Sequence, residues 1–290
     1  MYQLFFDSDC DVSLEIANKY HAKLISMPYT IKGEEIAPYK DWEVFDYKAF
    51  NNALRAGDAD PTTMALNVNE YLTYFEPVLK EGKDILYVHF SRKMSATFNS
   101  CDAAIKQLLE KYPERRIQLI DTKGITICSL LSCLRIGDLY LEGTSIDEIV
   151  AVSDEIIDHS AAYFFADNLK FFARSGRVSG FSAFMGGMIG VKPVIHISKE
   201  GTMVSIDRAV GRKKVLEKIM DYVVKKEDHI KDYPIIIAHG DAMYLVEEFT
   251  KMLKEKFGDD IKYMVIPVNP TAGCHCGPDV LGISFHAKER

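Results

Sequence analysis

The chain has 290 residues, of which 48% are apolar and 27% are charged, and its formal net charge is −7 at pH 7. This composition is typical of a globular protein long enough for a large core and two domains. The negative charge argues against a nucleic-acid-binding protein, which needs a basic surface. No apolar run is long enough to span a bilayer and no signal-peptide pattern is found, so we expect a cytoplasmic protein.

The six cysteines are scattered along the chain, except for Cys274 and Cys276, which flank His275. In a cytoplasmic protein we expect all six to be free thiols. A metal ion is not expected at this tripeptide, because adjacent side chains rarely face one ion and no second Cys/His cluster has zinc-like spacing. We also expect no cofactor, and the sequence has neither a glycine-rich phosphate-binding loop nor a kinase signature.

The first 160 residues alternate between strand and helix patterns. Strands are predicted at residues 2–6, 24–31, 85–90 and 116–120, and helices at residues 12–20, 47–55, 67–80, 96–111, 125–140 and 145–159. The run at 85–90 is apolar nearly throughout, which is typical of a strand buried on both faces. Strands that alternate with helices and are joined by short loops predict βαβ units and a parallel sheet.

Polar turns follow the strands that end near residues 6, 90 and 120. Parallel strands end at the same edge of a sheet, and ligands bind outside that edge. The first turn carries Asp7, Asp9 and Asp11. Three carboxylates could hold a cation, although such residues more often cap a helix and satisfy turn backbone.

The turn after the second of these strands places Ser95 directly before the helix predicted at 96–111. The first N–H groups of a helix lack partners and its dipole makes that end positive, so it can hold an anionic head group. Thr97 adds a hydroxyl, and Arg92 and Lys93 add charge. From these residues alone, a Ser95 that only caps its own helix is the simpler interpretation.

Thr62 and Thr63 form a second candidate anion-binding element, because they follow a loop and stand shortly before the helix predicted at 67–80. Threonines in such a loop also commonly bond to their own backbone, and this interpretation is favoured when the pair is considered alone.

The pattern changes after about residue 160. Strands are predicted at residues 161–166, 191–197, 203–209, 235–239, 263–268 and 280–285, helices at residues 168–174, 213–224 and 242–256, and a glycine-rich loop at residues 273–278. The segment at 178–194 is apolar and rich in glycine and methionine, without a clear period. Flexible and bulky side chains beside glycines could line a cavity for an apolar ligand or simply pack in the core.

Seven short motifs occur in order along the chain: FDSDCD at residues 6–11, TTMAL at 62–66, FSRKMSAT at 90–97, DTK at 121–123, LKFFARSGRVS at 169–179, GVKPV at 190–194 and HCGP at 275–278. In this order and spacing, over the whole chain, they resemble the DegV family of bacterial fatty-acid-binding proteins. The departures from the family pattern lie in the head-group motifs, at Met64, Ala65, Arg92, Lys93, Ala96, Ser175 and Cys276. They concern ligand geometry and selectivity rather than the fold.

The resemblance implies two α/β domains, residues 1–158 with a parallel sheet in three α/β/α layers and residues 159–290 with a mixed sheet. It further implies a long-chain fatty acid between them, with its carboxylate held by hydroxyls and its acyl chain in an apolar tunnel. The head-group residues implied are Thr62, Thr63, Ser95, Thr97, Arg177, His275 and Gly277, of which Arg177 and His275 would supply positive charge. The tunnel residues implied are Phe181, Phe184, Met185, Met188 and Ile189. Each buried CH₂ contributes roughly 0.8 kcal/mol, so a tunnel would supply most of the affinity.

Some members of the family present the fatty acid to a separate kinase, which forms an acyl phosphate for phospholipid synthesis. On this resemblance the protein is a carrier rather than an enzyme, with transient membrane contact as one way to exchange lipid.

Two other functions remain open. A hydrolase or transferase could use His275 with Cys276 or Ser95 as base and nucleophile, although no G-x-S-x-G elbow is present. A sugar- or ketone-binding domain like that of dihydroxyacetone kinases would need a polar pocket, whereas the segment at 178–194 favours an apolar one.

Overall fold

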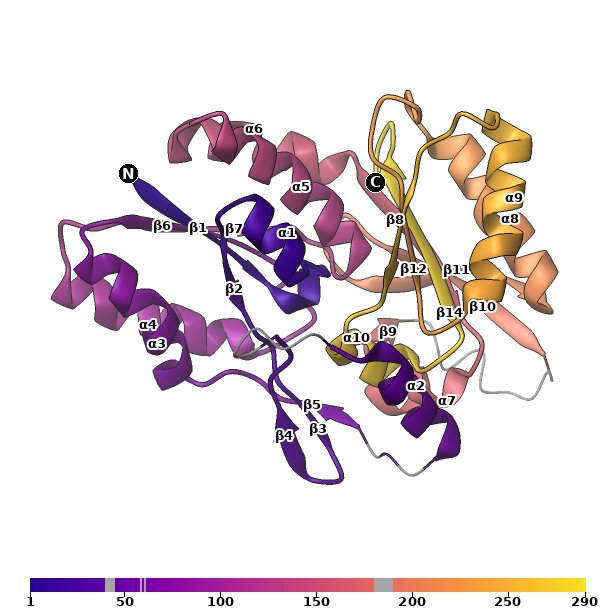
Figure 1. Ribbon diagram of the computed structural model, residues 1–290, viewed down its shortest axis with the longest axis horizontal. Coiled ribbons are helices and arrows are strands. Elements are labelled where there is room, and N and C mark those ends of the chain that lie inside the picture. The colour runs from indigo at the N-terminus through magenta and orange to yellow at the C-terminus, as the bar shows by residue number, and fades with distance from the viewer. Residues whose placement is uncertain (40–44, 58, 60, 180–189) are drawn as a thin grey trace.

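The computed structural model describes residues 1–39, 45–57, 59, 61–179 and 190–290, and it has two main sheets (Figure 1). The first sheet is entirely parallel and has the strand order β2-β1-β6-β7. Its strands are β1 (Tyr2–Asp7), β2 (Lys23–Ile25), β6 (Asp84–His89) and β7 (Ile117–Asp121). Five of the six residues of β6 are buried, as its apolar sequence predicts.

Helices cover both faces of this first sheet. Figure 1 shows α5 (Ile127–Leu141) and α6 (Ile146–Asp158) on one side of it, and α3 (Val68–Lys80) and α4 (Thr97–Lys111) on the other. The short helices η1 (Ser8–Cys10) and α1 (Leu14–Lys19) follow β1. The predicted three-layer arrangement with a parallel sheet is therefore confirmed.

The second sheet is mixed, with the order β13-β12-β14-β8-β10-β11-β9. Its strands are β8 (Ser160–Ala166), β9 (Val178–Ser179), β10 (Val191–Ile197), β11 (Met203–Val210), β12 (Ile236–His239), β13 (Met264–Pro267) and β14 (Val280–His286). On one face lie α8 (Arg212–Lys226) and α9 (Met243–Phe257), and α5 packs on β8 and β14. A division of the chain after residue 158 stays a prediction.

A small antiparallel sheet projects from the N-terminal half, with β3 (Tyr29–Ile31) between β4 (Glu34–Ile36) and β5 (Thr62–Thr63). Two sequence predictions were wrong here. The strand expected at 24–31 is divided between two sheets, and Pro28, which cannot donate to a ladder, lies at the break. The threonine pair, expected in a loop, is itself a strand paired with β3.

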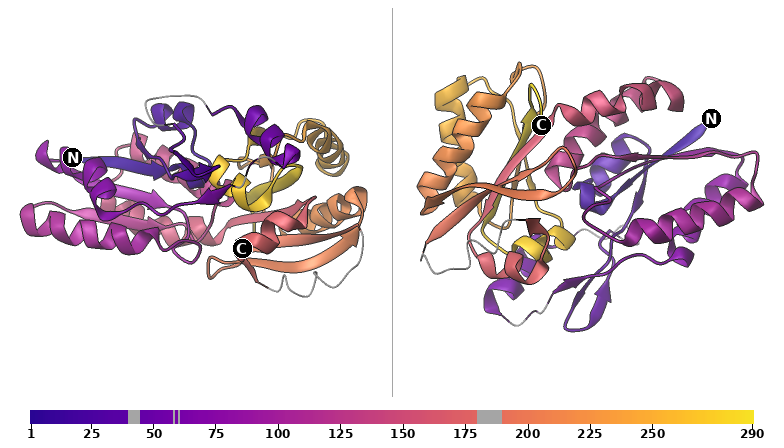
Figure 2. Two further views of the ribbon diagram at one scale, coloured as in Figure 1. Left: turned by 90° about the horizontal axis from the view of Figure 1, so that it is seen from below. Right: turned by 180° about the vertical axis from the view of Figure 1, so that it is seen from behind.

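The segment expected as a glycine-rich loop is instead a helix, α10 (Pro270–Cys276). Asn269 caps it by accepting a hydrogen bond from the N–H of Ala272 at 2.9 Å, and Pro270 occupies its first turn. Helix α7 (Leu169–Ser175) and helix α2 (Tyr47–Ala56) both contact α10, and Figure 2 shows α2 beside it. The N-terminal half thus reaches across to the C-terminal sheet.

No helix in the described part of the chain combines the length and the apolar character needed to cross a membrane.

Candidate functional site

An apolar cavity lies between the start of α5, the second sheet, α7 and α10. Its walls are almost entirely carbon, and the residues that form them are Ile125, Thr126, Ile127, Ala162, Phe164, Phe172, Ile197, Met203, Ala238, Val268, Ala272, His275, Cys276, Val280 and Gly282. Strand β14 contributes Gly282 to the wall, where an added Cβ would lie 2.9 Å from the Cβ of Phe164. A cavity of this character suits a hydrocarbon rather than a polar molecule.

A polar pocket adjoins this cavity and shares four wall residues with it, namely Ile125, Met203, Ala272 and His275. Its polar wall residues are Asp9, Thr63, Ser95, Arg177, Thr271 and His275. Three of the predicted head-group residues in addition to His275 therefore meet here, although they come from β5, the turn before α4, and the turn after α7. The carboxyl edge of the first sheet forms part of this pocket, as the sequence predicts.

The pocket in turn joins a basin on the surface. Both are lined by Thr63, Met64, Met94, Ser95 and Arg177, and the basin adds Ala65, Arg92, Lys93, Ala96 and Asn99. Cations therefore flank the route from solvent, hydroxyls follow, and the apolar cavity lies innermost. This order matches an amphiphile that has an anionic head and an apolar tail.

The two threonines of β5 face opposite ways, because neighbouring side chains in a strand alternate. Thr63 points inward, and its Oγ1 lies 3.1 Å from Nε2 of His275. Thr62 is exposed, and its Oγ1 lies 3.3 Å from Oγ1 of Thr30. Only Thr63 of the pair lines the pocket.

His275 lies on α10 between the apolar cavity and the polar pocket. Burial, and to a lesser extent the nearby guanidinium groups of Arg177 and Arg174, lower the pKa of its imidazole to about 4. His275 is therefore neutral at pH 7, so it acts as a hydrogen-bonding group there and does not supply the positive charge expected of it. Arg177 is exposed, and it donates from Nη1 to the carbonyl oxygen of Ser175 at 2.6 Å.

Ser95 stands one residue further from α4 than predicted, since the helix begins at Thr97 and Ala96 is at the N-cap. Its Oγ accepts a hydrogen bond from the N–H of Thr97 at 3.2 Å, which leaves the hydroxyl proton available to a ligand. Thr97 is buried instead in the protein core. Its Oγ1 accepts from the N–H of Leu66 at 3.0 Å and lies 3.1 Å from the hydroxyl of Tyr71.

Gly277 ends α10 with a φ of 71° and does not line the described pockets. A Cβ at this position would lie 2.3 Å from Cδ2 of Phe171 on α7, so only glycine permits the contact between these two helices. Gly277 thus supports His275 from two residues away rather than facing the pocket. The predicted tunnel residues Phe181, Phe184, Met185, Met188 and Ile189 lie outside the described residues.

Two pocket residues, Asp9 and Thr271, were not assigned to the head-group site from the sequence. Asp9 belongs to the acidic turn for which a cation was considered, and within the described ranges no three or more His, Cys, Asp or Glu side chains are arranged to hold a metal ion. No sequence pattern marked Thr271 as a pocket residue, because its position depends on α10, a helix that was not predicted from the sequence. Its Oγ1 donates to Asp9 Oδ1 and lies 2.7 Å from Oδ1 of Asn269.

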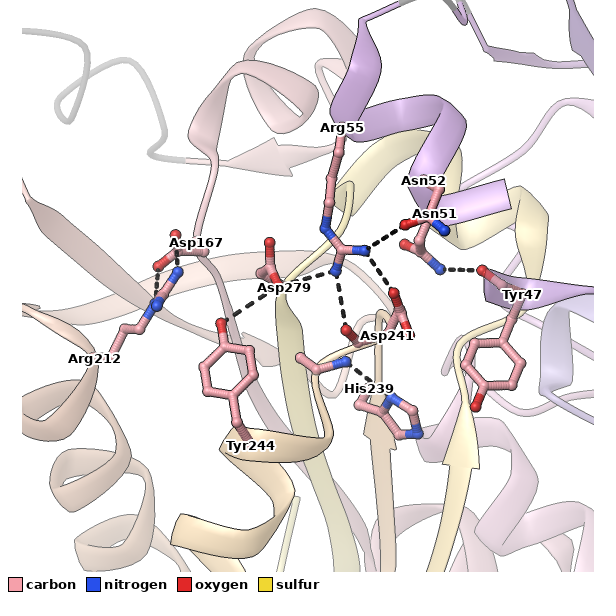
Figure 3. A network of polar contacts seen from close by, with 11 residues as sticks. Tyr47, Asn51, Asn52, Arg55, Asp167, Arg212, His239, Asp241, Tyr244 and Asp279 are labelled. Carbon is pink, nitrogen blue, oxygen red and sulfur yellow. Dashed lines mark hydrogen bonds and ion pairs between the residues drawn. The ribbon is translucent and has the colours of Figure 1, made fainter. Parts of the chain in front are cut away.

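Helix α2, which precedes the threonine strand in the chain, is held against the C-terminal half by polar contacts (Figure 3). Arg55 on α2 binds Oδ2 of Asp241 at 2.5 Å, the carbonyl oxygen of Asp241 at 2.9 Å and Oδ1 of Asp279 at 3.1 Å. On the same helix, Phe50 packs so closely on α10 that a Cβ at Gly273 would lie 2.7 Å from its ring. These contacts fix α2 against the C-terminal half of the chain. The last residue of α2 lies six residues before Thr62.

The described geometry does not assemble the nucleophile and base of a hydrolase. The hydrogen-bond partner of His275 Nε2 is Thr63, rather than Cys276 or Ser95. Burial raises the pKa of the Cys276 thiol to about 12, whereas a catalytic thiol needs a lowered pKa.

Comparison with known proteins agrees with this architecture. A relative from Clostridium perfringens, a DegV domain-containing protein, is 30% identical over 285 residues, covering 98% of this chain and 97% of the relative. The solved structure of a stearic-acid-binding protein from Eubacterium ventriosum has a TM-score of 0.86 at 21% identity, and that of a fatty-acid-binding DegV family protein from Thermus thermophilus has 0.85 at 22%. Each covers 99% of both chains.

The family model described as "Uncharacterised protein, DegV family" matches residues 1–288. Together with the relative of 30% identity, this match over nearly every residue shows that the chain belongs to the DegV family.

Proposed function

We propose that this protein binds a long-chain fatty acid, with the acyl chain in the apolar cavity and the carboxylate in the adjoining polar pocket. The observation that carries the proposal is that the apolar cavity and the polar pocket adjoin and share the wall residues His275, Ala272, Ile125 and Met203. The similar proteins of Eubacterium ventriosum and Thermus thermophilus, which are described as fatty-acid-binding, support the same ligand class.

The energetics of such a ligand fit the two environments. Each methylene group that leaves water contributes roughly 0.8 kcal/mol, so the chain supplies most of the affinity. The carboxylate would lose its hydration and therefore needs donors inside the protein. Thr63, Ser95 and Arg177 offer hydroxyl and guanidinium donors at one end of the apolar cavity. The exposed Thr62 and the buried Thr97 are less suited to this role.

The protein would act as a carrier that presents the carboxylate to a separate fatty acid kinase. Three head-group residues, Thr63, Ser95 and Arg177, also line the surface basin, so a bound carboxylate would lie near solvent within reach of a partner. If so, the loaded protein alone forms no acyl phosphate from ATP, and formation of acyl phosphate requires an added kinase from the source organism. Acyl phosphate made by the purified protein alone would contradict the carrier role.

Filling the apolar cavity tests the binding proposal. Ala162 lies on β8 in the cavity wall, and Ala162→Leu places three more carbon atoms there. We expect the affinity for oleate, measured by displacement of a fluorescent fatty acid, to fall at least tenfold, because the added side chain occupies the space of the acyl chain. The melting temperature should not fall in parallel.

Ala151→Leu is the matched control, since Ala151 is exposed on α6 and away from the cavity. It should bind oleate as the wild type does. Unchanged oleate affinity in a folded Ala162→Leu protein would contradict the placement of the acyl chain.

A further inference from the structure

Asp9 is held in the wall of the polar pocket by the turn after β1. It belongs to η1, and its carbonyl oxygen accepts a hydrogen bond from the N–H of Thr126 at 2.7 Å. Thr126 adopts a φ of 53°, which is rare for a β-branched residue, so the contact is made at a strained position. Asp9 is only 7% exposed, yet it lines the same pocket as Thr63, Ser95 and Arg177.

The two carboxyl oxygens of Asp9 have different surroundings. Oδ1 accepts a hydrogen bond from Oγ1 of Thr271. Among the residues that the structure describes, no donor lies within hydrogen-bonding distance of Oδ2. Oδ2 keeps some accessible surface and lies open to the pocket, so a ligand can supply the partner that the protein does not.

The groups around Asp9 favour the protonated form. Asp7 and Asp11 lie in the same turn, and each already accepts hydrogen bonds: Asp7 from Cys10, Tyr87 and Phe90, and Asp11 from the backbone and side-chain nitrogens of Asn269. Burial, then the charge of Asp7, raises the pKa of Asp9 to about 8, and Asp11 adds a smaller effect in the same direction. Across the pocket stand the cation of Arg177 and the neutral imidazole of His275.

We propose that Asp9 is a head-group ligand, whose protonated carboxyl donates a hydrogen bond through Oδ2 to the carboxylate of the bound fatty acid. The inference rests on the proposed function. A carboxylate is an acceptor only, and a protonated carboxyl is a donor, so the two groups are complementary where two carboxylates would repel. An O–H···O⁻ bond is short and strong because one partner is charged.

Binding of a fatty acid should then depend on the proton of Asp9. When Asp9 loses this proton at alkaline pH, two negative charges share one pocket and the affinity falls, by up to about tenfold for each pH unit above the pKa. A ligand with an uncharged head group would not be repelled in this way. The affinity for oleyl alcohol should therefore change much less with pH than the affinity for oleate.

The test compares wild-type and Asp9→Asn proteins, each stripped of lipid, for binding of oleate and oleyl alcohol at pH 6.5 and 9.0. Asparagine keeps an oxygen for Thr271 and presents an N–H donor that does not titrate. We expect wild-type affinity for oleate to fall tenfold or more between the two pH values, and the variant to stay within about threefold. An equal fall in both proteins would overturn the inference and assign the titration to other groups, such as Asp7 or Asp11.

A second outcome would also overturn it. If Asp9→Asn binds oleate at least tenfold more tightly than wild type at pH 6.5, Asp9 is ionised and repels the ligand.

Infrared spectroscopy of the lipid-free proteins separates this inference from the proposed function. We expect a carboxylic-acid band at pH 7 that Asp9→Asn removes, and its absence overturns the inference even when oleate binds. Failure of wild type to bind oleate at either pH would instead refute the proposed function.

Discussion

At the scale of single residues, the site depends on which of two adjacent hydroxyls faces inward. Thr63 reaches His275 at 3.1 Å, whereas Thr62 bonds to Thr30 on the exposed side of the small sheet. The imidazole is neutral because burial lowers its pKa to about 4, so the pair forms an uncharged donor–acceptor network beside the cation of Arg177. One hydroxyl of the strand thus faces the polar pocket.

Thr63→Val should weaken oleate binding by about 5- to 30-fold. Valine keeps the shape and the strand preference of threonine but removes the hydroxyl, and a hydrogen bond to a charged group contributes about 1.5–3 kcal/mol, part of which water can replace. Titration calorimetry with oleate measures the change. Thr62→Val makes the same substitution one residue away and should stay within about twofold of wild type. Equal losses in both variants would contradict the assignment of Thr63.

The sequence could place both threonines near the head group, but it could not choose between them. The choice follows from the pleat of β5, and that strand has only two residues, too few for a periodic signal. From the sequence, Asp9 was considered only as a capping or cation-binding residue. Its place in the pocket depends on Thr271, which is 262 residues away in the chain.

At the scale of secondary structure, α2 anchors the head-group strand to the C-terminal half of the protein. Arg55 bridges Asp241 and Asp279, two non-glycine residues with φ values of 53° and 59° in adjacent loops (Figure 3). The three side chains are between 23% and 32% exposed, so solvent screens these ion pairs only in part. Loss of the bridge should therefore loosen α2 before it affects the two main sheets.

Arg55→Ala should lower the free energy of local opening of α2 by about 1–2 kcal/mol, because it removes a network of charged hydrogen bonds that is partly buried. Hydrogen exchange followed by mass spectrometry measures this as faster exchange in the peptide spanning α2. We also expect oleate to dissociate several-fold faster, since β5 follows α2.

Lys231→Ala removes an exposed ion pair with Asp260 and serves as the control. It should leave exchange in α2 unchanged. If Arg55→Ala also leaves exchange in α2 unchanged, the helix is held by packing alone, and the anchoring role of Arg55 is refuted.

The sequence predicted most helices and strands within a few residues, and the exceptions have local causes. Helix α10 was taken for a loop because its seven residues include Gly273 and a proline, and glycine weakens helix formation. Its stability comes from the cap at Asn269 and from packing against α7 and α2. Tertiary contacts of this kind are absent from any local pattern.

At the scale of the whole molecule, buried ionisable groups link stability to pH. Burial is the main factor that raises the pKa of Asp7 to about 6, of Asp11 to about 7 and of Asp9 to about 8. Each carboxyl holds its proton more tightly in the folded protein, so its stabilising effect is present at low pH and is lost as pH rises. Burial lowers the pKa of His89 and of His275 to about 4, which destabilises the protein below pH 6.5.

Above pH 6.5 the carboxyls determine the sign, because the imidazoles are neutral in the folded protein and lose their remaining charge in the unfolded chain within about one pH unit. The free energy of unfolding of lipid-free protein should fall by roughly 1–3 kcal/mol between pH 6.5 and pH 8.5. Urea denaturation at the two pH values measures it. Asp9→Asn should show a smaller fall. A free energy that is unchanged or higher at pH 8.5 would show that these carboxyls are already ionised at pH 6.5 in the folded protein.

The sequence also anticipated the two main sheets, the parallel one from strands that alternate with helices and the mixed one from the resemblance to the DegV family. It could not give the strand order of the second sheet, which brings β14 between β12 and β8. The apolar cavity depends on that order, since β8 and β14 face the start of α5 across it. The cavity is therefore a property of the whole fold.

The most direct test of fatty-acid binding is native mass spectrometry of the purified protein, followed by denaturation and analysis of the extracted lipid. The structure predicts one long-chain fatty acid per protein, or uptake of one added oleate or palmitate when the protein is purified empty. A protein that carries no lipid and takes up neither fatty acid would contradict the account.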